Sequence, residues 1–428
     1  MFKIDKNNFK GKEIRVLISN FFSLLILQGL NVLLPFFTIP FIYNLLGVEY
    51  LGILTIGNTI AILFSVFVDF GFNNSATREI SLKSEDKKEL ERIFSEVLTT
   101  KFFLTIISLI VYAILIFSVP NYNKHWDLFL LYSGIIIGLA LFPLWFFQGM
   151  QQMKYITYIN VFFKSLFTIC IFIFVHSLKE IWLIPVFVSL GYLLSGIASL
   201  LLVRYKFQIS FYIASFNEVK NQLNSSYHLF LSELYITLLA NTNVIVLDFF
   251  AGSSAVGIYS IAEKVIRAAG NLLNPFVNVL YPHIAKKMEE NIKEGVTLVN
   301  KVIKWGTIFI LSVSILVFIF ADLLFFIIFK DKDDGSLKNI VLVFRILSIF
   351  PLLSFLDQVY GKLILITTGK ERLFSKVFSI CAVLNLFLCF VLSYLYQYLG
   401  AAIGSTIIQL LLAYGMYYYA KPVINNNR

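Results

Sequence analysis

The sequence predicts an all-α integral membrane protein with twelve transmembrane helices. Apolar side chains make up 58% of its 428 residues and charged side chains only 14%, whereas soluble domains carry about 25% charged residues. Twelve apolar runs also reach the roughly 20 residues that a helix needs to cross the hydrocarbon core. These runs cover residues 17–42, 51–72, 97–119, 128–148, 157–177, 182–203, 228–250, 256–281, 305–328, 339–366, 376–396 and 402–420.

Positive charge is unevenly distributed over the segments that connect these runs. If the N-terminus lies in the cytoplasm, the inward segments hold 25 of the 35 Lys and Arg residues and the outward loops hold five. Cytoplasmic loops of membrane proteins carry such an excess, so both termini are predicted to be cytoplasmic. The net charge of +10 then reflects contact with anionic membrane lipids, and nucleic acid is not expected as a partner.

An internal repeat relates the two halves of the chain with an offset of 205 residues. Residues 46–56 align with residues 251–261, and each stretch has two glycines five residues apart. The glycines are Gly47 and Gly52 in the first copy and Gly252 and Gly257 in the second. Glycine suits a tight turn and a close backbone approach, and both stretches fall between the first two spans of a half.

The repeat divides the chain into two lobes of six helices each. The N-terminal lobe is predicted to comprise residues 1–210 and the C-terminal lobe residues 211–428. Because each half has an even number of spans, the halves share one orientation in the membrane, and such transporters place their sites between the halves. The connecting segment 204–227 is either an amphipathic segment on the inner leaflet or an irregular loop. The sequence Ser84-Glu85-Asp86 predicts a helix start that extends the third span into the cytoplasm.

The eighth span, residues 256–281, has one strongly polar face. At 100° per residue, five polar residues fall within an arc of about 80°, and Lys264 widens it to about 100°. The five are Glu263, Arg267, Asn271, Asn274 and Asn278. A charge at mid-membrane costs roughly 3 kcal/mol, so this face is predicted to line a protein interior that binds or passes something polar. Two alternatives stay open: the asparagines join helices by hydrogen bonds, or Glu263 and Arg267 form a self-neutralising structural pair.

Other polar residues within spans fall mainly in the first, second, seventh and tenth. They include Gln28, Asn31, Asp69, Arg345 and Asp357. Because the first two spans of each half correspond under the repeat, we interpret this concentration as one central cavity lined by both halves. Arg267 and Arg345 are the predicted anion ligands, since a guanidinium stays charged and can hold phosphate through two parallel hydrogen bonds. For Asp69 and Lys362 the alternative is snorkelling to the interface.

Enzymatic and energising motifs are not found. The sequence contains no G-x-x-x-x-G-K-[ST] loop, so the chain is expected to have no nucleotide motor of its own. Its four histidines are scattered without metal-ligand spacing, so neither a metal nor a cofactor is expected. The outward loops of about ten residues leave little room for the catalytic loop of a membrane polymerase or glycosyltransferase. The protein is therefore predicted not to be an enzyme.

Several short motifs occur in a recognisable order along the chain. They are Asn31-x-x-x-Pro35-x-x-x-x-Pro40, Leu46-Gly47-x-x-x-x-Gly52, Asp69-Phe70-Gly71-Phe72, Ala76-Thr77-Arg78-Glu79, Phe142-Pro143-Leu144-Trp145-Phe146-Phe147-Gln148-Gly149-Met150 and Val256-Gly257-Ile258-Tyr259-Ser260. Their order and placement resemble the O-antigen and capsule repeat-unit flippases, the Wzx-like translocases of the multidrug/oligosaccharidyl-lipid/polysaccharide exporter superfamily. The resemblance covers essentially the whole chain in length and span count.

The resemblance implies a V-shaped exporter fold with a central cavity between two six-helix lobes. It also implies a flippase that moves undecaprenyl-diphosphate-linked oligosaccharide repeat units from the cytoplasmic to the outer leaflet of the bacterial inner membrane by alternating access. This transport would serve cell-surface polysaccharide biosynthesis. The protein is expected to be a monomer that associates loosely with the polysaccharide polymerase.

The resemblance also assigns roles to the polar residues. The cationic cavity residues of the family correspond to Arg267, Lys264 and Arg345, and Arg78 corresponds to a structural or gating residue. The amides expected to bind sugar hydroxyls are those of Asn271, Asn274, Asn278, Gln28 and Asn31. Without a motor, transport must be driven by an ion gradient or by consumption of the product, and Asp69, Glu263 and Asp357 are the titratable candidates for coupling.

The alternative function is an ion-coupled multidrug or organic-cation antiporter of the same superfamily. A cation exporter should favour carboxylates and aromatic residues in its cavity. The polar face that carries Arg267 argues against this alternative.

Overall fold

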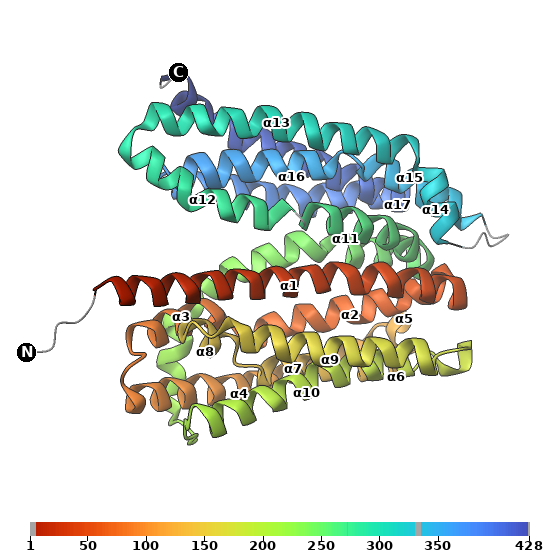
Figure 1. The fold of residues 1–428 in the computed structure, drawn as a ribbon. Helices are drawn as coiled ribbons and strands as arrows, with labels where there is room; N and C mark the ends of the chain where they lie inside the picture. Colours follow the sequence, from red (N-terminus) through yellow and green to blue (C-terminus); the bar gives the residue numbers. More distant parts are fainter. Residues whose placement is uncertain (1–5, 272, 330–334, 427–428) are drawn as a thin grey trace, which may run out of the picture. The chain divides into compact units, whose positions relative to one another are not determined.

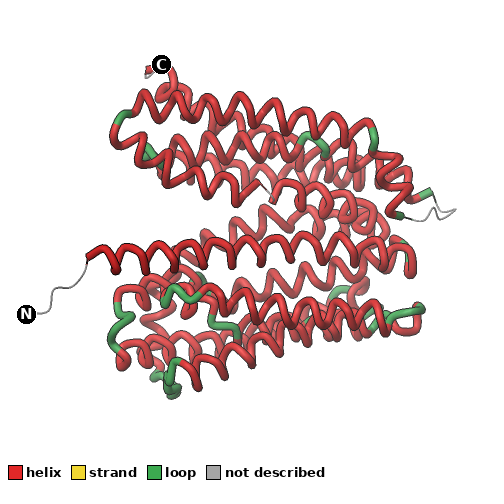
Figure 2. The backbone as a smooth tube through the Cα atoms, in the orientation of Figure 1, coloured by secondary structure: helices red, strands yellow, loops and turns green. Residues whose placement is uncertain are grey.

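The computed structural model describes residues 6–271, 273–329 and 335–426, and within these ranges it contains helices and turns but no strand (Figures 1 and 2). Ten helical stretches in the described residues are long and apolar enough to cross a membrane. Two of these stretches are 55 residues long, and each is interrupted by one non-helical residue, Gly252 or Gln397. The predicted all-α membrane class is confirmed, whereas the count of twelve helices and the cytoplasmic termini stay predictions.

The helices are named in chain order in Figure 1. They are α1 (Lys6–Leu46), α2 (Val48–Asp69), α3 (Phe72–Leu82), α4 (Lys87–Ser118), α5 (Pro120–Asn123), α6 (Trp126–Leu131), α7 (Ser133–Leu141), α8 (Leu144–Gly149), α9 (Met153–Phe174), the 3₁₀-helix η1 (Leu178–Glu180), α10 (Leu183–Lys206), α11 (Phe216–Asn271), α12 (Leu273–Glu290), α13 (Ile292–Ile319), α14 (Ala321–Ile328), α15 (Ser336–Leu347), α16 (Phe350–Gln358), the π-helix η2 (Val359–Ile366) and α17 (Glu371–Asn426).

The chain forms two compact units that are not contiguous in sequence. One, called here the N-terminal unit, comprises Met1–Leu34 and Gly57–Thr237. The other, the C-terminal unit, comprises Pro35–Ile56 and Leu238–Arg428. The lobe boundary at residues 210 and 211 stays a prediction.

Helix α4 of the N-terminal unit begins where the sequence predicts a helix start. The Asp86 carboxylate accepts hydrogen bonds from the backbone N–H groups of Lys88 and Glu89, at 3.0 and 3.3 Å. This cap satisfies N–H groups that have no partner within the helix. The predicted extension of the third span is therefore confirmed, since α4 runs from Lys87 to Ser118 without interruption.

The segment 208–215 between α10 and α11 has no regular secondary structure, which agrees with the irregular-loop alternative for this part of the connection. Alternate N–H groups of this segment bind side chains one turn apart on α4. The donors are the backbone N–H groups of Ser210, Tyr212 and Ala214, and the acceptors are Glu91, Ser95 and Thr99, at 2.9, 3.1 and 3.1 Å. Four helical residues rise about 6 Å and two extended residues about 6.6 Å, so the two spacings match.

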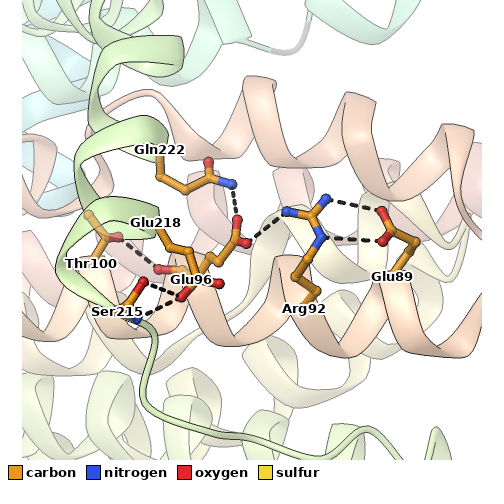
Figure 3. A network of polar contacts seen from close by, with 7 residues as sticks. All are labelled: Glu89, Arg92, Glu96, Thr100, Ser215, Glu218 and Gln222. Carbon is orange, nitrogen blue, oxygen red and sulfur yellow. Dashed lines mark hydrogen bonds and ion pairs between the residues drawn. The ribbon is translucent and has the colours of Figure 1, made fainter.

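A polar network holds the start of α11 beside α4, as Figure 3 shows. The Arg92 guanidinium bridges Glu89 and Glu96 on α4, and the Gln222 side chain of α11 donates a hydrogen bond of 2.8 Å to Glu96. The Glu218 carboxylate accepts hydrogen bonds from Ser215 just before α11 begins. The connection between the two halves is thus fixed to α4 and is not a free tether.

In the C-terminal unit, the glycines of the repeat form a reciprocal contact. A methyl group added at Gly52 would lie 1.8 Å from the carbonyl oxygen of Ser253, and one added at Gly257 would lie 2.1 Å from that of Val48. The same offset of 205 relates both pairs, so the two copies contact each other through equivalent backbone. The preceding glycines, Gly47 and Gly252, have φ of 89° and 75°, which L-residues rarely adopt. The predicted roles of these glycines, a tight turn and a close approach, are confirmed.

Candidate functional site

The C-terminal unit contains a polar cavity of about 260 Å³. Its walls come from the last turns of α11, from α16 and η2, and from α17. The polar lining residues are Arg267, Ser354, Asp357, Gln358, Lys362 and Gln409. Phe350, Phe374 and Phe378 complete much of the wall. A cavity with charged groups inside a membrane-spanning unit is a default candidate for a functional site.

Arg267 belongs to α11, and three contacts within the C-terminal unit hold its side chain in place. Its Nε donates a hydrogen bond to Oε1 of Glu263 at 2.8 Å, and its Nη2 donates to the carbonyl oxygen of Ala240 at 3.3 Å. Its guanidinium carbon also lies 5.7 Å from the ring centroid of Phe350. Two of the five guanidinium N–H groups are therefore used by described residues. The others are available to a ligand in the cavity.

A buried hydrogen-bond network lies behind the Glu263–Arg267 pair. The Tyr259 hydroxyl donates to Oε1 of Glu263 at 3.2 Å and lies 2.9 Å from Oγ of Ser405. The Asn243 amide donates to both hydroxyls, at 3.0 and 2.7 Å. This network orients Glu263, which in turn orients Arg267. The ion pair between Glu263 and Arg267, given above as the structural alternative for these two residues, does form. The Arg267 guanidinium also lines the cavity.

Asp357 of α16 lines the same cavity. Its carboxylate is buried and accepts a hydrogen bond from the side-chain amide of Gln409 on α17. Lys362, for which snorkelling was the alternative, lines the same cavity from η2. Gln409 was not predicted, although it is a lone amide within the apolar run 402–420 and could have been noticed for that reason.

The charges of the lining favour an anion. Two cations, Arg267 and Lys362, face one carboxylate, Asp357, so the lining carries a net charge of +1 when all three are ionised. Glu263 does not belong to the lining, but it is paired with Arg267 at 2.8 Å and offsets the charge of that guanidinium. With Glu263 counted, the four groups sum to zero when all are ionised and to +1 when Asp357 carries a proton. The affinity of the site for a phosphate-like group would therefore depend on protonation.

The other two predicted cations lie outside the lining of this cavity. Lys264 donates a hydrogen bond of 3.2 Å to the Thr55 hydroxyl within the C-terminal unit. Arg345 on α15 forms an ion pair with Asp322 of α14, and its guanidinium carbon lies 5.6 Å from the ring centroid of Phe318. The anion-binding roles of both residues stay predictions. The side chains of Asn271, Asn274 and Asn278 lie outside the described residues.

Asp69, a predicted coupling residue, forms an ion pair in the N-terminal unit. Its carboxylate lies 2.6 Å from Nζ of Lys101, a lysine that is only 1% exposed and also donates to the carbonyl oxygen of Leu139 at 3.0 Å. Removing one partner of such a pair would leave an uncompensated buried charge. No sequence signal predicted this pairing of Asp69 with Lys101.

The remaining predicted residues of the N-terminal unit are dispersed. Asn31 accepts a hydrogen bond of 3.3 Å from Nζ of Lys164. The Gln28 side-chain oxygen is buried and has no hydrogen-bond partner among the described residues. Arg78 on α3 is exposed. Of the twelve predicted site residues, the structure brings together Arg267 and Asp357 in one cavity, with Glu263 attached through Arg267.

Comparison with known proteins identifies the family. Residues 17–288 match the model of the family described as polysaccharide biosynthesis protein. Two relatives are named "Putative O-antigen transporter". The one from Escherichia coli (strain K12) is 30% identical over 384 residues, 90% of this chain and 92% of the relative. The one from Shigella dysenteriae is 27% identical over 395 residues, 92% and 97% of the two chains.

Solved structures with 13% sequence identity share the fold. The lipid II flippase MurJ in an inward closed conformation matches with a TM-score of 0.75, over 97% of this chain and 90% of its own. An inward-facing MATE family transporter of the MOP superfamily matches with a TM-score of 0.71, over 94% and 98%. The resemblance inferred from the motifs is confirmed. The family model matches well over half of the residues of this chain. This chain therefore belongs to the polysaccharide biosynthesis protein family.

Proposed function

We propose that this protein is a flippase for undecaprenyl-diphosphate-linked oligosaccharide repeat units. It moves them from the cytoplasmic to the outer leaflet of the bacterial inner membrane for cell-surface polysaccharide biosynthesis. The observation that carries the proposal is Arg267 in a polar cavity of a membrane-spanning unit, because the guanidinium lines the cavity in addition to its pairing with Glu263 and a guanidinium can hold phosphate through two parallel hydrogen bonds. Relatives named as O-antigen transporters support a transporter and not an enzyme.

The proposed architecture has twelve crossings in two six-helix lobes, residues 1–210 and 211–428, around a central V-shaped cavity. Both termini are cytoplasmic in this proposal, in accordance with the excess of Lys and Arg in inward segments. The two 55-residue helical stretches support the count, since each is broken by one non-helical residue, Gly252 or Gln397, and can cross twice. The protein works as a monomer, in loose association with the polymerase that uses its product.

Alternating access would expose the substrate site first to the inner and then to the outer leaflet. In this proposal Arg267, Lys264 and Arg345 bind the diphosphate, and Arg78 contributes to gating. The residues that bind sugar hydroxyls are Asn271, Asn274, Asn278, Gln28 and Asn31. Amides suit that role because each offers both hydrogen-bond donors and an acceptor.

The proposed coupling group is Asp357, with Glu263 and Asp69 as further candidates. A proton on Asp357 makes the cavity lining more positive and thereby strengthens its attraction for a diphosphate. Loss of the proton favours release. Because proton and substrate would then bind together, this coupling makes transport depend on pH, while the drive toward the outer leaflet comes from consumption of the product.

Substitution of Asp357 tests this coupling. Asp357→Asn fixes the group in a neutral state, so we expect the transport rate to lose its dependence on pH, while the wild type keeps it. The measurement is initial flux in liposomes over a series of pH values, with Asp127→Asn, an exposed residue of α6, as the control. An unchanged pH profile in Asp357→Asn would exclude this carboxylate from coupling.

The function itself is tested by reconstitution. Purified protein in liposomes should transfer a lipid-linked oligosaccharide, labelled on its sugar, between leaflets faster than protein-free liposomes do. Transfer is followed by quenching with a reagent that does not cross the membrane. A matched lipid that carries the same sugar without the diphosphate should not be transferred. Export of an organic cation without transfer of the lipid would favour the antiporter and contradict the proposal.

A further inference from the structure

A second cavity in the C-terminal unit, of about 360 Å³, lies at one end of α13 and α17. Its polar and aromatic lining residues are Asn300, Lys304, Tyr360, Tyr417, Lys421 and Asn425. No carboxylate belongs to the lining. Two lysines, two amides and two phenol hydroxyls therefore surround the space, which makes it a set of hydrogen-bond donors that suits an anion.

The two lysines carry charge that the described protein does not neutralise. Neither Lys304 nor Lys421 forms an ion pair in the part of the chain that the structure describes. By contrast, Lys287 of neighbouring α12 is paired with Glu294 at 3.0 Å. Both lysines are exposed, so water and salt screen their charges, and neither is engaged by a carboxylate of the described protein that would compete with an anion bound in the cavity.

The surroundings of this cavity have the residue pattern of a membrane–water interface. Trp305, next to Lys304, is 66% exposed, and Nζ of Lys304 lies 5.8 Å from its ring centroid. One turn further into α13, Ile308 and Phe309 are exposed apolar residues, whereas Lys301 is exposed one turn earlier. Exposed aromatic residues between a polar and an apolar surface are typical of the headgroup level of a bilayer.

Two packed tyrosine rings form part of the wall of this cavity. The rings of Tyr360 and Tyr417 pack edge to face, with centroids 5.2 Å apart and an interplanar angle of 62°. Tyr360 belongs to the π-helix η2, and π-helical segments often occur at functional sites. Ile424 of α17 is buried and also lines the cavity.

We propose that this cavity binds the phosphate headgroup of an anionic phospholipid. Lys304 and Lys421 contact the phosphate, and the amides of Asn300 and Asn425 contact hydroxyl groups of the headgroup. The acyl chains lie along the exposed apolar face of α13 beyond Trp305. A lipid is favoured over a soluble phosphate compound because the cavity adjoins this apolar face.

Native mass spectrometry of the full chain tests the site. Protein from mixed phosphatidylglycerol and phosphatidylcholine micelles should retain phosphatidylglycerol preferentially. In Lys304→Gln/Lys421→Gln we expect about thirtyfold weaker retention, since each lysine near an anionic headgroup contributes about fivefold. The control Lys293→Gln/Lys301→Gln removes the same charge from α13 outside the cavity and should behave as the wild type. The charge-preserving Lys304→Arg/Lys421→Arg should retain the lipid.

Other outcomes would overturn the proposal. Equal retention of both phospholipids by the wild type, or equal loss in the control variant, would show that no specific headgroup site exists here. Displacement of the lipid by an equimolar amount of inorganic phosphate would assign the cavity to a soluble anion. Preferential retention of undecaprenyl phosphate would assign it to the lipid carrier of the proposed substrate. None of these results depends on transport, so they are distinguishable from failure of the proposed flippase activity.

Discussion

The two copies of the repeat share a backbone but differ in charge. The start of α2 and the part of α11 that follows Gly252 have the same left-handed glycine and the same close approach five residues later. The offset of 205 nevertheless pairs uncharged residues of the first copy with charged residues of the second. Asn58 corresponds to Glu263, Thr59 to Lys264 and Ile62 to Arg267.

This difference separates the residues that fix the backbone from the residues that form the site. The glycines fix how the two copies meet in the C-terminal unit, and both copies need them. At these three positions the charges occur only in the second copy, where Glu263, Tyr259 and the Ala240 carbonyl compensate Arg267. A duplicated framework can therefore carry a polar cavity on one side alone, because the turn geometry does not depend on the side chains about three to four helical turns further on.

The largest expected effect comes from removing the guanidinium that the second copy places at the cavity. Arg267→Ala removes charge-assisted hydrogen bonds to the substrate that are worth about 3 kcal/mol, roughly a hundredfold in transport. The corresponding Ile62→Ala should stay close to the wild type. Complementation of a flippase-null strain, read as surface glycan display, measures both variants, and membrane abundance should be unchanged.

A second variant separates lost binding from a stranded carboxylate. Glu263→Gln/Arg267→Met removes both members of the pair, so no uncompensated charge remains, and it should fail to complement as well. Normal glycan display by Arg267→Ala would remove this arginine from the mechanism.

The next effect concerns the shared scaffold. Gly52→Ala and Gly257→Ala each introduce a methyl group within about 2 Å of a carbonyl oxygen of the other copy, and overpacking of this kind costs about 1–3 kcal/mol. We expect both variants to lower the thermal unfolding temperature in detergent by similar amounts. Gly29→Ala, where nothing lies within 4 Å, serves as the control. Clearly unequal shifts for the two variants would contradict the symmetry of the contact.

The smallest expected effect comes from substituting Lys264, which lies at the edge of the polar face of the eighth span. Lys264→Thr gives the second copy the residue of the first, and it removes one hydrogen bond to Thr55 without altering the cavity lining. We expect the initial flipping rate in liposomes to fall a few-fold, equivalent to about 0.5–1 kcal/mol. A loss as large as that of Arg267→Ala would instead mean that Lys264 contributes as much to binding of the diphosphate as Arg267 does.

Much of the fold could be predicted because a bilayer permits few structures. Every backbone polar group must be satisfied inside the hydrocarbon core, so long apolar runs become helices. The repeat followed from glycine spacing, and the start of α4 from Asp86. The breaks at Gly252 and Gln397 are harder to predict, and Gln397 in particular has φ of 51°, a conformation that its residue type does not suggest.

The site was predictable only where a charge stood out. Arg267 and Asp357 are conspicuous within apolar runs, and the structure brings them to one cavity. Gln409, Ser405 and Asn243 are neutral residues whose cost in a membrane is small, so composition gives them little weight. The pairing of Lys101 with Asp69 and of Arg345 with Asp322 depends on which helices become neighbours. Periodicity along a single helix contains no information about that choice.

The hydrogen bonds of the linker to α4 have a consequence for how this chain can change during evolution. Alternate amides at positions 210, 212 and 214 are engaged, while the side chains of Phe211 and Ile213 are exposed. Their identities can drift as long as the number of residues stays the same. Insertion or deletion of a single residue would turn every following N–H group to the wrong side. Length, more than sequence, is what natural selection should preserve in this stretch.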